Sequence, residues 1–323
     1  AALDSKAATN PRREKSIPIR VVKRSSAPRS TVHLRFHTAN PRDSAAIMRK
    51  PVALMFIAMS FIPMGDTAGK LLVAQNGVAP IYVAWTRFVV GAILGLPFIP
   101  AGTWPLFKDW RVWIRALLLT GGITSILTAL QTEPIANVFG AFFIGPILSF
   151  FLSSCLLREP ITRAQTLFLF LGFVGVLLVV KPGFGMTQGL GFAVLAGCCY
   201  GAFLTASKWL AETARPRSLL FTQLGISAAV TLPFGFQAVP PMTTEIAALT
   251  FASGLCSMLG NLILILAYRM APSTTLAPFV YFQLIAATTL GWLVFKDLPD
   301  TLTLVGLALL IGSGFASLIR QRA

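Results

Sequence analysis

The sequence predicts an all-α integral membrane protein with ten transmembrane helices, arranged as two inverted five-helix repeats. Three observations support this fold class. Apolar residues make up 55% of the 323 residues and charged residues only 12%, with a mean hydropathy of +0.74, which is unlike a soluble domain. Ten apolar stretches have the length of a membrane-spanning helix. The two halves of the chain match at a constant offset.

The ten apolar stretches follow one another with short links. Windows of about 19 residues locate them, and the alternation typical of a membrane β-barrel is absent. The predicted spans are 52–75, 80–99, 112–131, 134–157, 164–181, 189–209, 218–238, 245–268, 272–295 and 301–319. No link is long enough for a catalytic or nucleotide-binding domain, and no phosphate-binding GxxxxGK[ST] motif is present. The sequence therefore argues against an ATP-driven pump.

The repeat divides the chain into a basic tail (1–47), a first five-helix repeat (48–183) and a second one (184–323). An offset of 138 residues aligns Met48 with Met186, Lys70 with Lys208, Gly122 with Gly260, Ala129 with Ala267, and Pro134 with Pro272. It also aligns two blocks, 157–162 and 295–300, that each place a basic and an acidic residue at the end of an apolar helix. Because each repeat has an odd number of spans, the second copy is expected to cross the membrane in the opposite direction.

The positive charge predicts the orientation of the chain. The net charge is +16, and with a cytoplasmic N-terminus most Lys and Arg residues, Arg115 included, are assigned to inside segments. The outside loops then hold only Lys181 and Lys296. The positive-inside rule therefore predicts a multi-pass protein of the cell's inner (cytoplasmic) membrane with both termini cytoplasmic. The expected macromolecular surroundings are the lipid bilayer, and no nucleic-acid partner is expected.

The tail, residues 1–47, is rich in Arg, Ser, Thr, Ala and Pro and shows no apolar periodicity. Three interpretations stay open: a transit-like peptide, a polybasic arm that binds anionic lipid headgroups, or residues upstream of a natural start at Met48. The third is favoured. Because such a composition cannot bury enough apolar surface to fold, we expect disorder in each case.

Asp66 is the acidic residue that lies deep within a predicted span. A rise of 1.5 Å per residue puts Asp66 roughly 21 Å from the inner edge and Arg87, on the next span, at matching depth. A lone charge there costs about 3 kcal/mol or more, so an ion pair or a wet cavity is expected. The pair has two interpretations: a structural staple, or a site where Asp66 binds a proton or an amine and Arg87 a carboxylate. Lys70, one turn further, is expected to snorkel to the interface.

Other candidates for substrate contact or gating lie in the spans. Pro63 beside Gly65 marks a hinge or a static kink. Polar and aromatic side chains could contact a substrate or join helices; they are Asn137, Tyr200, Gln223, Asn261, Tyr281 and Gln283. Two glycine pairs, Gly91xxxGly95 and Gly197xxxGly201, indicate close helix packing, either within the chain or in a homodimer.

No catalytic residue, cofactor or metal site is expected. The four cysteines, Cys155, Cys198, Cys199 and Cys256, lie in predicted spans, whereas both histidines lie in the tail. This spacing does not match a metal site. An integral-membrane enzyme would need clustered His, Asp or Glu in the bilayer or a facing loop, and the lone Asp66 does not supply this.

From about residue 51 to 319 the chain resembles EamA-type transporters of the drug/metabolite transporter superfamily. The strongest part is Gly140–Gly175, where Pro146 precedes the block at 157–162 and then Gly172 and Gly175. The second copy has Ala277–Tyr281, Lys296, Asp297 and Gly312, with Asp297 where Glu is usual. The resemblance implies two five-helix repeats, cytoplasmic ends and a central cavity.

Together, the residues and the resemblance predict a secondary-active or facilitative transporter of a small organic metabolite that works by alternating access. Amino acids or related compounds leaving the cell are the expected substrates. A channel or facilitator for small polar solutes is the alternative, and an integral-membrane enzyme is a weaker one. Coupling to protons would depend on Asp66.

Overall fold

The computed structural model describes residues 41–157, 163–182, 185–210, 213–270 and 277–321, and these ranges contain helices and no strand. The α-helices are α1 (Pro41–Lys70), α2 (Pro80–Gly95), α3 (Trp110–Leu130), α4 (Ile135–Phe142), α5 (Ile144–Leu157), α6 (Arg163–Val180), α7 (Gln188–Leu210), α8 (Pro216–Gln237), α9 (Thr244–Met270), α11 (Phe282–Leu290) and α12 (Thr301–Gln321). π-Helical turns at Leu71–Gln75 and Gly291–Phe295 extend α1 and α11, and a 3-10 turn at Ala277–Tyr281 precedes α11.

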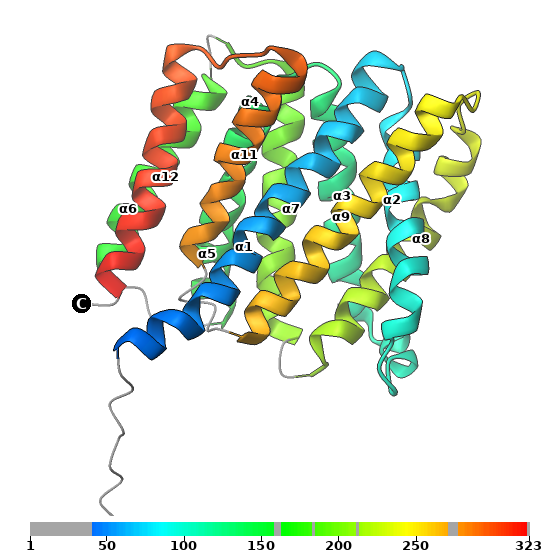
Figure 1. Ribbon diagram of the computed structural model, residues 1–323, viewed down its shortest axis with the longest axis horizontal. Helices are drawn as coiled ribbons and strands as arrows, with labels where there is room; N and C mark the ends of the chain where they lie inside the picture. Colours follow the sequence, from blue (N-terminus) through cyan, green and yellow to red (C-terminus); the bar gives the residue numbers. More distant parts are fainter. Residues whose placement is uncertain (1–40, 158–162, 183–184, 211–212, 271–276, 322–323) are drawn as a thin grey trace, which may run out of the picture. The chain divides into compact units, whose positions relative to one another are not determined.

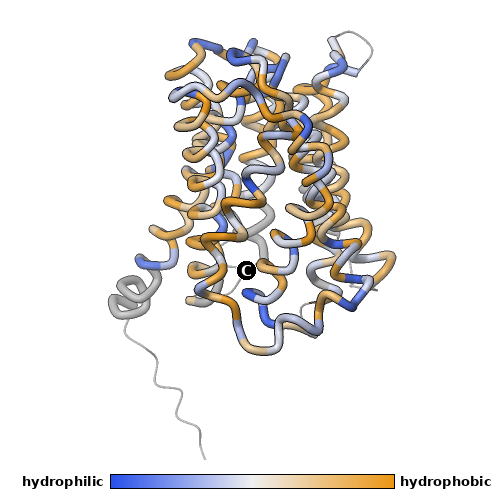
Figure 2. Tube along the Cα trace, turned by 90° about the vertical axis from the view of Figure 1, so that its right-hand side faces the viewer, coloured by the Kyte–Doolittle hydropathy of each residue, from blue (hydrophilic) through white to orange (hydrophobic). Residues whose placement is uncertain are grey.

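Seven helices of the described ranges are long and apolar enough to cross a membrane. They correspond to predicted spans one to four and six to eight. Three shorter apolar stretches, Phe170–Val180, Phe279–Phe295 and Thr301–Gly314, fall within the other three predicted spans. Figure 2 shows apolar residues along the helices and hydrophilic residues gathered mainly towards their ends. The chain is therefore a multi-pass membrane protein whose described elements are all helices.

Two boundaries differ from those that the sequence predicts. Helix α1 begins at Pro41, so residues 41–47, assigned to the tail, are helical; residues 1–40 lie outside the described ranges. The fourth predicted span is divided at Phe143 into α4 and α5. Residues 158–162, most of the first basic-acidic block, also lie outside the described residues.

The helices pack in pairs that join the two halves of the sequence (Figure 1). Helix α1 packs along α9, and α3 along α7. At one side of the view α6 pairs with α12, and at the other side α2 pairs with α8. Helices α4 and α5 contact α7, and α11 contacts α1. The largest buried cluster joins residues of both halves, among them Leu127 of α3, Phe139 of α4, Ala193 of α7 and Leu284 of α11.

Two of these interfaces use glycines at equivalent positions. A Cβ at Gly260 of α9 would lie 3.2 Å from the Ile62 nitrogen and 3.3 Å from the Ala58 carbonyl of α1. A Cβ at Gly122 of α3 would lie 3.9 Å from the Tyr200 nitrogen and 3.5 Å from the Ala196 carbonyl of α7. Since glycine has no side chain, both pairs of helices approach closely at these points.

The two glycine pairs predicted for close packing lie at contacts within the chain. A Cβ at Gly197 would overlap Phe142 and Ile144, and one at Gly201 would overlap the Gly145 carbonyl. Gly91 faces Leu224, and Gly95 lies near Phe221. Both pairs therefore pack α2 and α7 against helices of the same chain, which is the first of the two interpretations that the sequence left open.

The α6–α12 interface generates a stability prediction. A Cβ at Gly306 would lie 2.7 Å from the Gly175 carbonyl, whereas one at Gly312, on the same helix, meets nothing within 4 Å. We expect Gly306→Ala to destabilise the protein by about 1–3 kcal/mol through overpacking. Gly312→Ala, the matched control, should leave stability unchanged or raise it slightly through helix propensity. Thermal unfolding in detergent measures both, and equal melting temperatures for the two variants would contradict the prediction.

Candidate functional site

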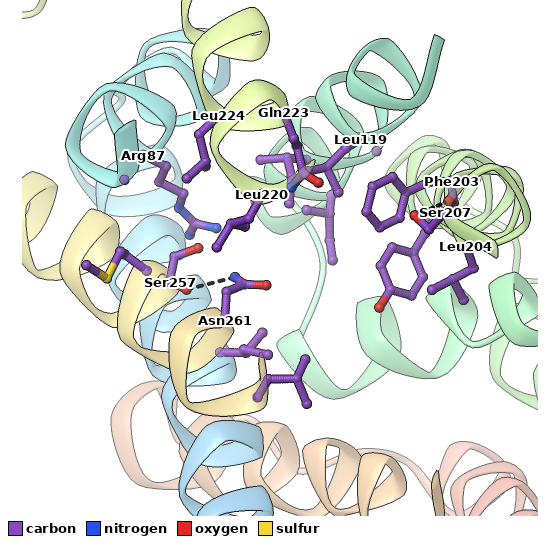
Figure 3. A pocket seen from close by; sticks show the side chains of 18 of the residues that line it. Arg87, Leu119, Phe203, Leu204, Ser207, Leu220, Gln223, Leu224, Ser257 and Asn261 are labelled. Carbon is purple, nitrogen blue, oxygen red and sulfur yellow. Dashed lines mark hydrogen bonds between the residues drawn. The ribbon is translucent and has the colours of Figure 1, made fainter. Parts of the chain in front are cut away.

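A cavity of about 480 Å³ lies between the two halves of the chain (Figure 3). Its walls come from α1, α2, α3 and α4 and from α7, α8, α9 and α11. The residues on its walls that the sequence offers as candidates are Asp66, Arg87, Tyr200, Gln223, Asn261 and Gln283. The other three candidates, Pro63, Asn137 and Tyr281, do not line it. Its size is in the range of small-molecule sites.

Arg87 and Asp66 form a buried ion pair on one wall. The Arg87 Nη1 lies 2.5 Å from Asp66 Oδ1, and both residues are 5% exposed. Arg87 also donates from Nη2 to the Gly65 carbonyl (2.7 Å) and from Nε to Ser253 Oγ (2.7 Å). A side chain at Gly69 would overlap the Arg87 guanidinium. This cluster therefore joins α1, α2 and α9, and the pair forms as expected from the matching depths of Asp66 and Arg87 in their spans.

Arg115 is a second arginine that lines the same cavity. It is 7% exposed. Its Nε donates to Ser207 Oγ (2.8 Å), and its Nη1 donates to the Leu219 carbonyl (3.0 Å). Its guanidinium carbon lies 4.5 Å from the centre of the Phe203 ring. No carboxylate within the described residues bonds to it; Glu212 lies outside them.

Arg115 lies within a helix and not in a link between helices. Because α3 begins at Trp110, Arg115 falls in the second turn of a helix and faces the cavity with Leu119 and Gly122. These residues share one helix face through their i, i+4, i+7 spacing. That periodicity is the sequence signal that could have identified Arg115, whereas counting charges between spans conceals it.

Aromatic rings lead from Arg115 into the cavity. The Phe203 and Tyr200 rings stack with centroids 5.8 Å apart, and the Tyr200 and Phe142 centroids are 4.9 Å apart. All three residues line the cavity. Figure 3 shows Phe203 and Ser207 on one side of the cavity, with Arg87 and Asn261 on the other. We call Phe142, Tyr200 and Phe203 the aromatic row.

Amide side chains add polar groups to the walls. Asn261 donates from Nδ2 to the Ser257 carbonyl at 2.8 Å (Figure 3). Gln223 is 6% exposed, and its Oε1 has no hydrogen-bond partner within the described part of the chain. Gln283, from α11, is also buried on the cavity. A ligand with hydrogen-bonding groups would therefore find partners here.

The candidates outside the cavity have other surroundings. The Tyr281 ring lies 5.2 Å from that of Phe143. Asn137 has a buried Oδ1 without a partner among the described residues. Pro63 lies inside α1, and its carbonyl accepts from Thr67 Oγ1 at 2.8 Å.

Among the described residues, the cavity extends to one end of the helices. Ala214 and Pro216, at the link between α7 and α8, line it, but no described residue of the links at 131–134, 181–187 or 296–300 does. At the latter end, Lys70 Nζ donates to the Glu133 carbonyl (2.8 Å) and to Asp297 Oδ2 (3.2 Å). We call these three residues the Lys70 network.

Lys70 does not snorkel to water as the sequence analysis expects. Its side chain is 8% exposed, and its ammonium lies 4.6 Å from the Phe295 ring centre. Asp300, which is exposed and lies three residues after Asp297, pairs with Lys181 at 2.8 Å. The hydrogen bond from Lys181 holds the pKa of Asp300 below its usual value. Polar bonds thus join the links at the end that the cavity does not reach.

Comparison with known proteins gives a family match over most of the chain. The model of the EamA-like transporter family matches twice, at residues 49–181 and 187–318. An S-adenosylmethionine uptake transporter of Rickettsia conorii is 27% identical over 234 residues, which cover 71% of this chain and 79% of that protein. A riboflavin transporter of Brucella anthropi is 25% identical over 277 residues, 83% of this chain and 97% of that protein.

Two further comparisons extend this picture. The pseudopaline exporter CntI of Pseudomonas aeruginosa is 26% identical over 187 residues, 57% of this chain and 66% of that protein. One solved crystal structure superposes with a TM-score of 0.58 at 18% identity and covers 85% of this chain and 98% of its own. At that identity the likeness concerns the fold alone.

The buried pair generates a double-mutant prediction. Asp66→Asn leaves the Arg87 cation buried without a carboxylate and should cost about 3–5 kcal/mol, because desolvation is no longer compensated. The double variant, Asp66→Asn with Arg87→Met, removes both charges. We therefore expect it to lose clearly less stability than the sum of the losses in Asp66→Asn alone and Arg87→Met alone. Thermal unfolding in detergent measures each. Additive losses would show that the two side chains do not stabilise each other.

Proposed function

Because the chain belongs to the EamA-like transporter family, we propose that it carries a small organic metabolite across the cytoplasmic membrane by alternating access. The observation that carries this proposal is the cavity between the two halves, whose walls include the link between α7 and α8 but no described residue of the links at the opposite end of the helices. A site that both halves build, with access from one side at a time, is what alternating access requires. Neither the family nor the named relatives point to an enzyme.

The proposed architecture has ten spans in two inverted repeats. Counting α4 with α5 as one span, each helix of the first half corresponds to the helix five spans later. If each helix is replaced by the one that corresponds to it in the other half, the α1–α9 contact becomes the α7–α3 contact, and the α2–α9 contact becomes the α8–α3 contact. The same replacement leaves the α2–α8 and α6–α12 pairs unchanged. Such a pattern is expected if a two-fold axis relates the repeats.

The glycine contacts support the same correspondence. Gly122 and Gly260 differ by 138 residues, and so do their partners, Ala58 with Ala196 and Ile62 with Tyr200. The family model also matches the two halves separately. With five spans in each, the second repeat would run opposite to the first. Both termini then lie on one side, which the positive-inside rule assigns to the cytoplasm.

In this topology the described conformation is open towards the cytoplasm. The Lys70 network joins the links on the outer side, and we propose that it opens when the cavity turns outward. Pro63 removes a backbone donor within α1, so we propose that α1 bends there during the change. Tyr200, Asn261 and Gln283 would contact the substrate from the walls.

We assign Asp66 and Arg87 to the structural role rather than to proton coupling. All three Arg87 nitrogens donate to acceptors of α1 and α9, and one of these acceptors is the Asp66 carboxylate itself. A proton on Asp66 would have to displace this bond inside the bilayer, where an unpaired Arg87 is costly. Facilitated transport without a proton gradient is therefore the mode that this geometry favours.

The relatives differ in the substrate and in the direction of transport that their names give. Their names include uptake of S-adenosylmethionine, transport of riboflavin and export of pseudopaline. We keep amino acids or related compounds leaving the cell as the sequence-based expectation. A channel for small polar solutes is the second candidate, and saturation of transport separates the two.

Cysteine labelling tests the inverted topology. In a background with the four cysteines replaced by serine, Gly77→Cys and Thr213→Cys each place a thiol in the exposed link after the first helix of a repeat. We expect a membrane-impermeant reagent to label position 77 from outside and position 213 only after permeabilisation. Labelling of both from the same side would mean parallel repeats, and it would remove the basis for alternating access.

Counterflow into proteoliposomes tests the transport mechanism. Vesicles preloaded with unlabelled solute should transiently accumulate the radiolabelled solute, with saturation, for at least one of S-adenosylmethionine, riboflavin and the common amino acids. An imposed pH gradient should not change the initial rate. Flux that rises linearly with concentration would favour the channel, and flux driven by the pH gradient would contradict the uncoupled mode.

A further inference from the structure

The cavity carries a positive charge that its described walls do not neutralise. Its charged lining residues are Asp66, Arg87 and Arg115. Asp66 and Arg87 pair at 2.5 Å and cancel. The charge of Arg115 remains, because its described partners, Ser207 Oγ and the Leu219 carbonyl, are neutral. In a membrane interior such a charge favours a counter-ion, and a cavity supplies the space for one.

The geometry of Arg115 suits an incoming anion. Of the five N–H donors of a guanidinium, two make the bonds to α7 and α8. These bonds fix the guanidinium in place, and the remaining three donors have no partner among the described residues. Arg pairs well with carboxylates and phosphates because its planar donors match two oxygens at once. Arg87, in contrast, already has a carboxylate.

The aromatic row defines what the rest of the ligand must be. It begins at Phe203, 4.5 Å from the Arg115 guanidinium, and continues through Tyr200 to Phe142. Tyr200 lies seven residues before Ser207 on α7, so this wall extends about 10 Å from the Arg115 contact. Aromatic rings favour stacking with planar apolar groups. Gln223, one turn from Leu219 on α8, also lines the cavity, and its Oε1 has no hydrogen-bond partner among the described residues.

We propose that the cavity binds an organic anion whose carboxylate or phosphate pairs with Arg115 and whose planar, apolar body stacks along the aromatic row. This assignment rests on the proposed transport function and names its substrate class. The ion pair with Arg115 sets the preference for an anion, and the row sets the preference for an aromatic or conjugated body. The Asp66–Arg87 pair takes no part in the recognition.

Matched ligand pairs test the proposal on the purified full-length chain in a neutral detergent. Equilibrium binding is measured for indole-3-acetate against indole-3-acetamide, and for phenyl phosphate against phenol. We expect each anion to bind at least tenfold more tightly than its neutral analogue, since only the anion satisfies Arg115. The two pairs also separate carboxylate from phosphate recognition. Equal affinities within both pairs, in the wild-type chain, would overturn the proposal.

Variants of Arg115 and Arg111 test whether Arg115 causes the preference for an anion. Arg115→Gln should reduce the ratio of anion to amide affinity to near one while amide binding persists, and Arg115→Lys should keep a reduced preference. Arg111→Gln is the matched control, because it removes an equal charge one turn earlier on α3 at a residue that does not line the cavity. It should keep the wild-type ratio. An unchanged ratio in Arg115→Gln, or an equal loss in Arg111→Gln, would contradict the assignment.

Counterflow separates this proposal from the proposed function. Saturable exchange of neutral solutes without any exchange or binding of the anions would overturn the substrate class and leave transport standing. Arg115-dependent binding of the anions without counterflow of any solute would support the site and contradict transport. If Arg115→Gln does not fold, the wild-type affinity ratios still decide the outcome.

Discussion

The need to compensate charge inside an apolar medium is the constraint on which the structure depends. The Arg87 guanidinium meets this need with acceptors from two neighbouring helices: the Asp66 carboxylate, the Gly65 carbonyl and the Ser253 hydroxyl. Gly69 provides the space that the guanidinium occupies. Because the bonds radiate from one side chain, α1, α2 and α9 are held in a fixed register beside the cavity, and its shape follows from that register.

The second arginine of the cavity shows the same constraint with a different outcome. Arg115 has neutral partners and an aromatic neighbour in place of a described carboxylate. One cation is thus used to hold helices together, and the other is held in place while its charge remains available. Under the proposal that Arg115 binds an anion, the contrast explains how a cavity with mostly apolar walls could attract a polar molecule: the Asp66–Arg87 pair is neutral and holds helices together, whereas Arg115 keeps its charge for the ligand.

Much of the fold follows from the sequence, because the bilayer restricts both length and composition. The apolar stretches, and the depth match that pairs Asp66 with Arg87, can be calculated from helical rise alone. The choice of helix face cannot. Asn137 carries the same amide as Asn261, and Tyr281 lies two residues from Gln283, yet only Asn261 and Gln283 line the cavity. Arg115 was not predicted to line the cavity, because a charged residue near a predicted helix boundary is easily assigned to a link. The division of the fourth span at Phe143 was also not predicted, although Pro146, whose nitrogen cannot donate to the Phe142 carbonyl, is a local signal for it.

The α6–α12 seam has a mechanical consequence. Gly175 and Gly306 bring two main chains into contact, with no layer of side chains between them that could repack. Sliding along such a seam would collide carbonyls with the opposite backbone, whereas small rotations about it would not. If the halves rock, this edge of the bundle is suited to act as a fulcrum, and the largest displacements would then fall on the opposite edge, where α2 meets α8.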